Sequence, residues 1–329
     1  MSIRKKRTVS GMRPTGPLHL GHYFGVLKNW IAMQDTDECY YFIADWHALT
    51  SDYAAPQNIR EHSLSLVKDW LSAGLDPKKC VIFQQSAIKT HAELNLLLGM
   101  LTPVSWLERN PCYKEQRQEI SDKDLGNFGF LGYPVLQAAD ILIYRPDYVP
   151  VGQDQLPHLE LTREIARRFN YLYGNLFPEP EARLTPSPKC PGLDGRKMSK
   201  SYGNAIALTD TPELVEQKIR GMFTDQTRLR KSDPGHPDQC NLFPYHELLA
   251  SQEEQAEIRA NCTNTSLGCV DCKRIFAKKI LEFLEPLRSR RDFLDANPDL
   301  VREVLAHGNS QARKLASATM TRVRRRMGL

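Results

Sequence analysis

The fold of this chain is decided by the stretch Thr8-Val-Ser-Gly-Met-Arg-Pro-Thr-Gly-Pro-Leu-His-Leu-Gly-His22. A short strand pattern leads from Thr8 into Gly11, and helical spacing follows from Gly21 to about Met33. Cys39–Ala44 is a short apolar run bounded by polar residues, which predicts a second strand. Strands that alternate with helices of this length indicate a parallel sheet with crossover helices.

The same alternation continues along the first two thirds of the chain. We expect strands at Lys79–Gln84 and Asp147–Val151, and helices at Ile59–Ala73, His91–Met100, Tyr133–Tyr144 and Gln155–Phe169. The polar segment Pro103–Phe128 is predicted to be an irregular, mobile insertion, and residues from Thr211 onward are predicted to be helical. The expected fold class is therefore α/β, with a Rossmann-like parallel sheet in a catalytic domain over residues 1–203 and a helical domain over 204–329.

Composition excludes several classes of protein. The 329 residues are 25% charged and 41% hydrophobic, as in an ordinary globular protein. No apolar run approaches the ~20 residues of a membrane span, and no signal-peptide core follows the basic start. We therefore expect a cytoplasmic protein without a membrane partner. The net charge of +5 does not itself predict a nucleic-acid partner, and the basic clusters at 228–231 and 322–326 suit either phosphate contact or a solvated helix face.

Two histidines three positions apart, His19 and His22, lie in the turn between the first strand and the first helix. Glycine at Gly21 permits close approach of a ligand, and a helix N-terminus attracts negative charge. The histidines are therefore candidates for donating hydrogen bonds to a phosphate. Metal ligation is a poor alternative because no carboxylate is nearby, and the other alternative is that they are ordinary loop histidines.

A second motif, Lys197-Met-Ser-Lys-Ser201, lies on a loop with glycine on both sides. Its two lysines form a flexible pair of cations that can close over a triphosphate and neutralise departing pyrophosphate. The alternative is an exposed basic loop.

Four of the eight cysteines form the spacing C-x21-C-x6-C-x2-C, at Cys240, Cys262, Cys269 and Cys272. In a reducing compartment such thiols suit zinc or an iron–sulfur cluster rather than disulfides, and spacing alone does not separate the two. The alternative is four buried cysteines without a metal. The remaining cysteines are scattered, at Cys39, Cys80, Cys112 and Cys190.

Together the histidine turn and the lysine loop are similar to the paired signatures of class I aminoacyl-tRNA synthetases. The stretches Tyr133-Pro-Val-Leu-Gln-Ala-Ala-Asp-Ile141 and Val149-Pro-Val-Gly-Gln-Asp-Gln155 resemble the tryptophanyl-tRNA synthetase family, and the resemblance covers essentially the whole chain. It implies ATP-dependent activation of L-tryptophan to an adenylate, with Mg²⁺ accompanying ATP, followed by transfer to the cognate tRNA. It also implies a homodimer and an anticodon-recognition role for the helical domain.

The resemblance assigns roles to individual residues. In the family the residue matching Asp140 accepts the indole N–H, and the residue matching Gln155 holds the α-amino group. The catalytic residues are then His19, His22, Lys197, Ser199 and Lys200. The ATP-binding residues are Gly11, Arg13, Pro14, Thr15, Gly21, His22, Gly152, Gln153, Asp154, Cys190, Lys197, Met198, Ser199, Lys200 and Ser201. The tryptophan-binding residues are Val9, His47, Tyr133, Gln137, Asp140, Ile141, Val149, Val151 and Gln155. Asp140 has an alternative role as an ordinary helix-surface carboxylate.

A subset of the bacterial members carries a [4Fe–4S] cluster on nearly the same cysteine spacing, which favours that cluster here, with Zn²⁺ as the alternative. The chain departs from the common family pattern at Arg13, where glutamine is usual, and at Gln153, where glutamate is frequent. Lys114 and Arg117 are the candidates for the basic residue that the insertion at 110–128 brings to ATP.

Two rival functions stay open at this level. A tyrosyl-tRNA synthetase shares the fold and both signatures, although no tyrosine is evident as a partner of Asp140 for binding a phenol. A non-catalytic paralogue that binds tRNA and senses redox state through its cysteines is the other, and the intact lysine and histidine motifs argue against it.

Overall fold

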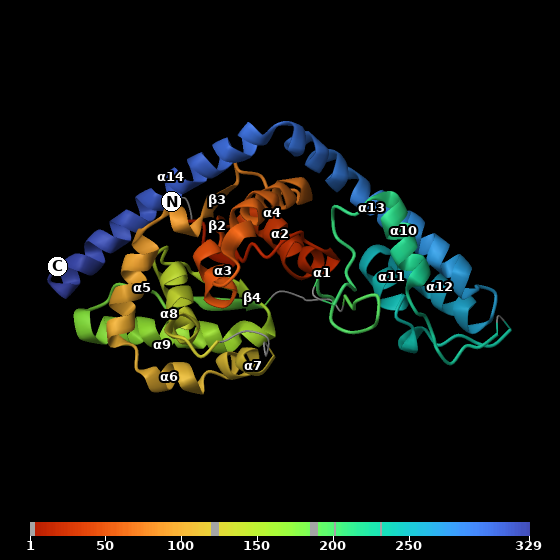
Figure 1. The fold of residues 1–329 in the computed structure, drawn as a ribbon, viewed down its shortest axis with the longest axis horizontal. Coiled ribbons are helices and arrows are strands. Elements are labelled where there is room, and N and C mark those ends of the chain that lie inside the picture. Colours follow the sequence, from red (N-terminus) through yellow and green to blue (C-terminus); the bar gives the residue numbers. More distant parts are fainter. Residues whose placement is uncertain (1–3, 120–124, 185–189, 201, 231) are drawn as a thin grey trace. The chain divides into compact units, whose positions relative to one another are not determined.

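A computed structural model describes residues 4–119, 125–184, 190–200, 202–230 and 232–329. The described residues contain one sheet of five parallel strands in the order β3-β2-β1-β4-β5 (Figure 1). The strands are β1 (Arg7–Met12), β2 (Glu38–Ile43), β3 (Cys80–Gln84), β4 (Tyr148–Val151) and β5 (Glu181–Leu184). Strand β2, inside the sheet, is apolar and buried at all but its first residue, as expected for a parallel sheet covered by helices. The predicted α/β class with a Rossmann-like parallel sheet is confirmed.

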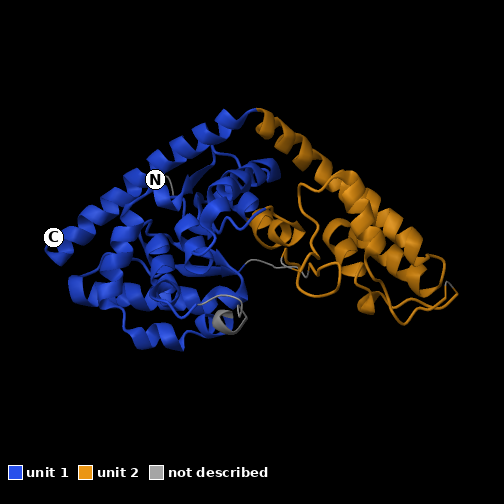
Figure 2. Ribbon diagram, in the orientation of Figure 1, with its two compact units in different colours: residues 1–16, 30–186, 297–329 blue, residues 17–29, 187–296 orange. Residues whose placement is uncertain are grey.

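The chain divides into two compact units, which Figure 2 colours separately. Unit 1 comprises residues 1–16, 30–186 and 297–329, and unit 2 comprises residues 17–29 and 187–296. Unit 1 holds the sheet with α3 (Asp45–Asp52), η2 (Pro56–Asn58), α4 (Ile59–Ala73), η3 (Gln85–Ala87), α5 (Thr90–Leu101), α6 (Val104–Arg109), α7 (Pro111–Glu119), α8 (Phe128–Leu142), η4 (Gln153–Gln155), α9 (Leu156–Tyr173) and α14 (Pro298–Met327). Unit 2 holds α1 (Leu20–His22), η1 (Tyr23–Leu27), α10 (Pro212–Gly221), η5 (Pro237–Gln239), α11 (Phe243–Leu249), α12 (Gln252–Thr263) and α13 (Cys269–Ala296), and α2 (Lys28–Thr36) crosses the boundary.

The largest described part of the core of unit 1 lies between the sheet and helices α5, α8, α9 and α14. The last helix, α14, lies directly along β3 at the edge of the sheet. Gly308 faces the backbone of Ile82, where a β-carbon would overlap the carbonyl oxygen. Asn309 Oδ1 accepts a hydrogen bond of 2.9 Å from the backbone N of Gln84. The exposed edge of the sheet is thereby covered by the C-terminal segment.

Two local predictions need correction. The segment Pro103–Phe128 was expected to be irregular, but its described part forms α6 and α7. Its polar residues are mainly Glu, Gln, Lys and Arg, which favour helices, and Leu107 and Tyr113 are buried on the inner side. The helix expected at Gly21–Met33 is divided into α1, the π-helical segment η1 and α2. None of the helices in the described part of the chain is long and apolar enough to cross a membrane.

Candidate active site

The strand order places a topological switch point between β1 and β4, the position at which open α/β sheets bind ligands at their carboxyl ends. Gly11 and Arg13 lie at the end of β1, and Gly152 follows β4. The ring of Phe42 occupies the space where Gly11 would carry a side chain, so packing within the sheet already requires glycine there. Arg13 is exposed, and its guanidinium lies 3.4 Å from the hydroxyl of Ser51.

Asp140 is buried in α8 and is surrounded by hydrogen-bond donors. Gln85 Nε2 lies 2.7 Å from each carboxylate oxygen, and His91 Nδ1 lies 2.6 Å from Oδ1. The other ring nitrogen of His91 lies 2.6 Å from the hydroxyl of Tyr144. Burial raises the pKa of Asp140, while the bonds from His91 and Gln85 act in the opposite direction. Asp140 is therefore not a solvated carboxylate on a helix surface.

A second group of polar rings lies around Tyr133. Its hydroxyl is 3.1 Å from Nε2 of His158, and its ring meets that of His47 edge to face at 5.4 Å. Burial, then the charge of Arg13, lowers the pKa of His47 to about 3, so this imidazole is neutral at pH 7. The backbone N of His47 donates to Oε1 of Gln85 at 3.1 Å. Gln85 therefore connects the His47 group with Asp140.

The apolar residues predicted to bind tryptophan lie in three different clusters. Ile141, Val149 and Val151 belong to one small cluster with Leu159, and Tyr133 belongs to a second. Val9 is fully buried in the main core of unit 1. Gln137 and Gln155 are half-buried, and Gln155 Nε2 donates to Asp154 Oδ2 at 2.9 Å.

In unit 2, His19 and His22 lie at the start of α1 with their ring centroids 3.8 Å apart. Nδ1 of His22 accepts the backbone N–H of His19 at 3.3 Å, so the proton of a neutral His22 ring sits on Nε2. Nδ1 of His19 is buried and has no hydrogen-bond partner among the described residues. Burial, then the charge of Lys200, lowers the pKa of His19 to about 4. Burial, then the charges of His19 and Lys200, lowers the pKa of His22 to about 3. Both rings are neutral at pH 7.

The lysine loop is tied to this turn within unit 2. Leu20 N donates to Ile206 O at 3.0 Å and Leu208 N donates to Leu18 O at 2.8 Å, which joins the turn to the segment after the loop. Asn204 is buried and organises the loop: its Oδ1 accepts from Ser199 N at 2.8 Å and its Nδ2 donates to Asp194 at 2.7 Å. Lys197 is exposed and Lys200 is half-buried.

The remaining residues predicted to bind ATP are found in several places. Gln153 and Asp154 form η4 after Gly152 and are exposed. Pro14 and Thr15 belong to the first segment of unit 1, where Pro14 is buried and Thr15 is exposed. Gly21 and Met198 belong to unit 2. Burial raises the pKa of Cys190 to about 12. Lys114 is exposed on α7, and both Ser201 and the side chain of Arg117 lie outside the described part of the structure.

The four clustered cysteines are half-buried around the start of α13. Cys269 and Cys272 are one turn apart on that helix, Cys240 directly follows η5, and Cys262 lies in α12. Burial, followed by the other three thiols, raises the pKa of Cys272 to about 12. His246 Nε2 lies 3.3 Å from the Cys272 sulfur. No three His, Cys, Asp or Glu side chains within the described ranges are already arranged to hold a metal ion.

The two basic clusters are partly engaged within the protein. Arg228 donates to Leu267 O at 2.9 Å beside Cys262, so it helps to order the cysteine segment. Arg324 forms a two-pronged ion pair with Glu93, and Arg326 donates to Tyr173 O at 3.0 Å. These three arginines therefore stabilise the fold, and only the remaining basic residues of the two clusters are left for contacts with a partner.

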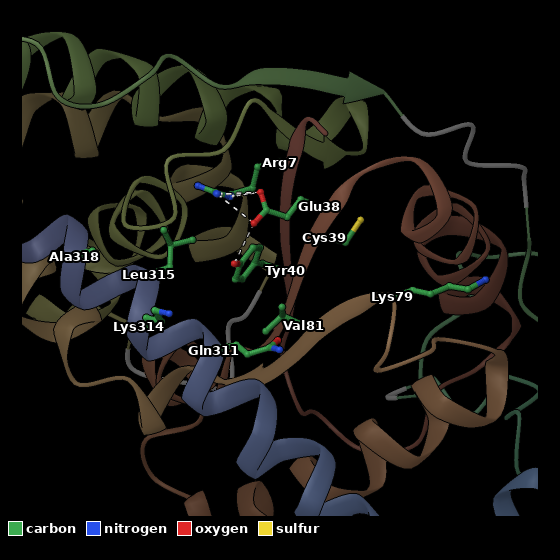
Figure 3. Close-up of a pocket in the computed structure, with 10 residues that line it drawn as sticks. All are labelled: Arg7, Glu38, Cys39, Tyr40, Lys79, Val81, Gln311, Lys314, Leu315 and Ala318. Atoms are coloured by element: carbon green, nitrogen blue, oxygen red, sulfur yellow. Dashed lines mark hydrogen bonds and ion pairs between the residues drawn. The ribbon is translucent and has the colours of Figure 1, made fainter. Parts of the chain in front are cut away.

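A separate cavity of about 500 Å³ lies at the amino ends of the strands, between the sheet and α14 (Figure 3). Its wall contains the ion pair of Arg7 and Glu38 beside Tyr40, and Lys314 and Leu315 from α14. None of the predicted site residues lines it.

Sequence reasoning missed Gln85, His91, Tyr144 and Asn204. The available signal was weak: Gln85 directly follows the predicted strand Lys79–Gln84, at the carboxyl end where parallel strands present functional side chains. His91 and Tyr144 have no local signal, because each lies at an ordinary position of an apolar helix or helix end.

Comparison with known proteins gives a consistent result. Residues 1–285 match the family model described as tRNA synthetases class I (W and Y). The chain is 52% identical to the tryptophan–tRNA ligase of Thermotoga maritima, with 98% of this chain and 99% of that protein covered. It is 46% identical to the ligase of Aquifex aeolicus over 98% and 100% of the two chains. The solved tryptophanyl-tRNA synthetase of Campylobacter jejuni, complexed with ADP and tryptophan, is 33% identical and superposes with a TM-score of 0.89 over 98% of this chain and 100% of that one.

Proposed function

The chain belongs to the class I tRNA synthetases of the tryptophan and tyrosine family, and we propose how its described residues divide the work of the reaction. It is an enzyme that activates L-tryptophan with ATP and transfers it to tRNA. The observation that carries this function is the 46–52% identity to tryptophan–tRNA ligases over nearly the full length of both chains. The rival tyrosine specificity has no comparable support. Tryptophan-dependent exchange of pyrophosphate into ATP tests the first step, with tyrosine and phenylalanine as the competing substrates.

In the proposed first step, a carboxylate oxygen of tryptophan attacks the α-phosphorus of ATP and forms a new P–O bond. The bond to the β-phosphate breaks, and pyrophosphate leaves with the magnesium ion that accompanied ATP. No protein nucleophile takes part. As in other phosphate chemistry, positioning and neutralisation of charge supply most of the rate enhancement.

His19 and His22 are proposed to stabilise the α-phosphate as neutral donors. Their lowered pKa values keep both rings uncharged at working pH, and the proton of His22 is directed to Nε2. The buried Nδ1 of His19 supports the same role, because a polar atom of this kind is normally satisfied by a ligand or water.

Lys197, Ser199 and Lys200 are proposed to bind the pyrophosphate portion of ATP. Lys200 already influences the pKa of both histidines, so its charge is close to the turn that faces the phosphate. Asn204 supports the loop by bonding the backbone N of Ser199 and the backbone O of Lys197. Adjacent to this loop, Cys190 is proposed to border the adenine ring.

The amino-acid pocket is proposed to form around Asp140, with the indole N–H donating to its carboxylate and the apolar residues Ile141, Val149 and Val151 along the ring. Three hydrogen bonds already reach Asp140, two on Oδ1 and one on Oδ2. An ionised carboxylate has about four acceptor directions, so capacity for one further donor is left on Oδ2. Gln155 is proposed to hold the α-amino group, with His47 and Tyr133 at the polar end of the substrate.

A [4Fe–4S] cluster on Cys240, Cys262, Cys269 and Cys272 is proposed as a resident cofactor, with Zn²⁺ as the alternative. Burial, and then the charges of other thiols of the group, raise the pKa of Cys240, Cys262 and Cys272, and four thiols this close together are a suitable donor set. Binding requires the thiols to lose protons and to draw closer together than they are in the described geometry. Such a group would hold η5, α12 and α13 together.

The domain roles, the partners and the assembly are also proposals. Residues 1–203 would carry the ATP and tryptophan sites, and residues 204–329 would recognise the anticodon of the tRNA in the cytoplasm. A homodimer is supported by the exposed apolar side chains of Leu96 and Met100 on α5, Val104 on α6 and Phe128 on α8. Helix α8 contacts both α5 and α6, and exposed apolar side chains are typical of surfaces that bind another protein. Sedimentation that gives only monomer at micromolar concentration would contradict the dimer.

A further inference from the structure

The imidazole of His91 is completely buried in an aromatic environment. The rings of Phe42, Phe83 and Tyr144 lie 6.2, 6.3 and 5.3 Å from it. Within the described part of the chain, its two nitrogens have one polar partner each: Asp140 at Nδ1 and the hydroxyl of Tyr144 at Nε2. Neither nitrogen has a second polar partner there. If one nitrogen accepts its hydrogen bond, the other therefore has to donate.

The hydroxyl of Tyr144 determines that direction. Tyr144 is fully buried, and burial raises the pKa of its hydroxyl well above 10, so it keeps its proton. The one hydrogen-bond partner of this hydroxyl among the described residues is Nε2 of His91. A buried O–H without an acceptor is unfavourable, so Tyr144 donates and Nε2 accepts. Nδ1 of His91 then carries a proton, which it donates to Oδ1 of Asp140.

The amide of Gln85 is also oriented so that it donates to Asp140. Its Oε1 accepts the backbone N–H of His47 at 3.1 Å, which turns Nε2 toward Asp140 at 2.7 Å from both oxygens. Each of these neighbours of Asp140 is therefore a donor. A proton on the carboxylate would find no acceptor among them, so the remaining capacity of Asp140 is for accepting alone.

We propose that Tyr144, His91 and Gln85 are positioning residues that hold Asp140 as an obligate acceptor and so restrict the amino-acid pocket to side chains that bring a hydrogen-bond donor. This inference rests on the proposed role of Asp140 in binding the indole N–H. It adds that the preference for a donor is set by residues behind Asp140, which do not touch the substrate.

The test compares tryptophan with 3-benzothienyl-L-alanine, in which sulfur replaces the indole N–H with little change of shape. The ratio of kcat/KM for the two amino acids in pyrophosphate exchange measures the preference for a donor. Tyr144→Phe should reduce that ratio about tenfold, as expected for weakening one buried hydrogen bond, and leave the KM for ATP unchanged. A variant that is only less stable would show an unchanged ratio and no selective rise in the KM for tryptophan.

Tyr40→Phe is the matched control. Tyr40 stacks on Tyr144 with ring centroids 5.4 Å apart. Its own hydroxyl donates to Glu38 Oε1 at 3.3 Å (Figure 3). Removing that hydroxyl should leave the ratio at its wild-type value. A folded Tyr144→Phe variant whose ratio stays within about twofold of wild type overturns the proposal.

Asp140→Asn separates this proposal from the function on which it rests. If Asp140→Asn lowers the ratio and Tyr144→Phe does not, Asp140 recognises the indole without help from the residues behind it. If neither variant lowers the ratio, the role of Asp140 itself is wrong. Should Tyr144→Phe fail to fold, ¹⁵N NMR of the wild-type enzyme decides: a proton on Nδ1 of His91 supports the proposal, and a neutral ring with its proton on Nε2 overturns it.

Discussion

Nδ1 of His91 lies 2.6 Å from Oδ1 of Asp140, although the two residues are 49 positions apart in the chain. The contact joins α5 to α8 inside unit 1, and it converts a carboxylate that sequence alone could place on a helix surface into a buried acceptor. The amino-acid specificity of the enzyme is best tested at this pair.

Asp140→Ala should raise the KM for tryptophan and lower the rate of activation. It should also narrow the gap in kcat/KM between tryptophan and phenylalanine. Sites built around a buried hydrogen bond discriminate by ~10⁴ against a substrate that lacks the donor, so the gap should shrink by at least about tenfold. Pyrophosphate exchange with tryptophan, tyrosine and phenylalanine measures it. An unchanged ranking in a folded variant would remove Asp140 from the recognition site.

Lys200→Ala should lower the rate of tryptophan activation about 10²-fold or more, because it removes one charge that stabilises the departing pyrophosphate. The binding of tryptophan should be little affected. Arg230→Ala, which removes an exposed positive charge elsewhere in unit 2, is the control and should activate normally. Normal activation by Lys200→Ala would exclude the lysine from the reaction.

The neutral histidines make stability depend on pH. The pKa values of His19 and His22 are lowered to about 4 and about 3, whereas in the unfolded chain each lies near 6.5. Between these values the unfolded chain binds protons that the folded chain does not. Stability is therefore complete above pH 6.5 and decreases as the pH falls toward 4, by roughly 1.4 kcal/mol per unit for each such group.

His22→Asn should make this decrease shallower when the free energy of unfolding in urea is measured at pH 4.5, 5.5 and 7. His307→Asn, at an exposed position of α14, should keep the wild-type slope. Equal slopes in the two variants would mean that His22 is not buried as a neutral ring.

The four-cysteine proposal is tested by metal content. Wild-type enzyme purified without oxygen should contain about four iron and four sulfide per chain, the content of one [4Fe–4S] cluster. Cys269→Ser should lose the iron, whereas Cys190→Ser, outside the cluster, should retain it. Zinc without iron in the wild type would support the Zn²⁺ alternative. The absence of any metal would contradict both the iron–sulfur and the zinc proposal.

Gly308→Ala should destabilise unit 1 by about 1–3 kcal/mol, because a β-carbon there would overlap the carbonyl oxygen of Ile82 and force α14 away from β3. Gly99→Ala, at a helical position of α5 with open space around it, should instead stabilise by about 0.5–1 kcal/mol. Thermal and urea unfolding of both variants gives the comparison. Equal effects would show that the contact between α14 and β3 is not close.

The corrected elements show where local patterns mislead. Pro103–Phe128 was expected to be irregular because it is polar, yet α6 and α7 form there. Polar residues with long unbranched side chains lose little freedom in a helix, and a few buried contacts, such as those of Leu107, hold the helices in place. Strand β5 was not predicted, because its four residues are mostly exposed and have no alternating pattern.

The sequence by itself determined the parallel α/β fold, the two signature motifs and the four-cysteine spacing, because each depends on residues that are close along the chain. A run of buried β-branched and aromatic residues specifies a strand, and a spacing of three places His19 and His22 on adjacent turns of the backbone. Only the tertiary structure decided that Gln85, His91 and Tyr144 surround Asp140, and that the last 33 residues (297–329) close the edge of the sheet in unit 1. These contacts join segments that lie 49 to 225 positions apart, and such pairing is set by how whole faces of helices and strands fit together, which no local pattern records.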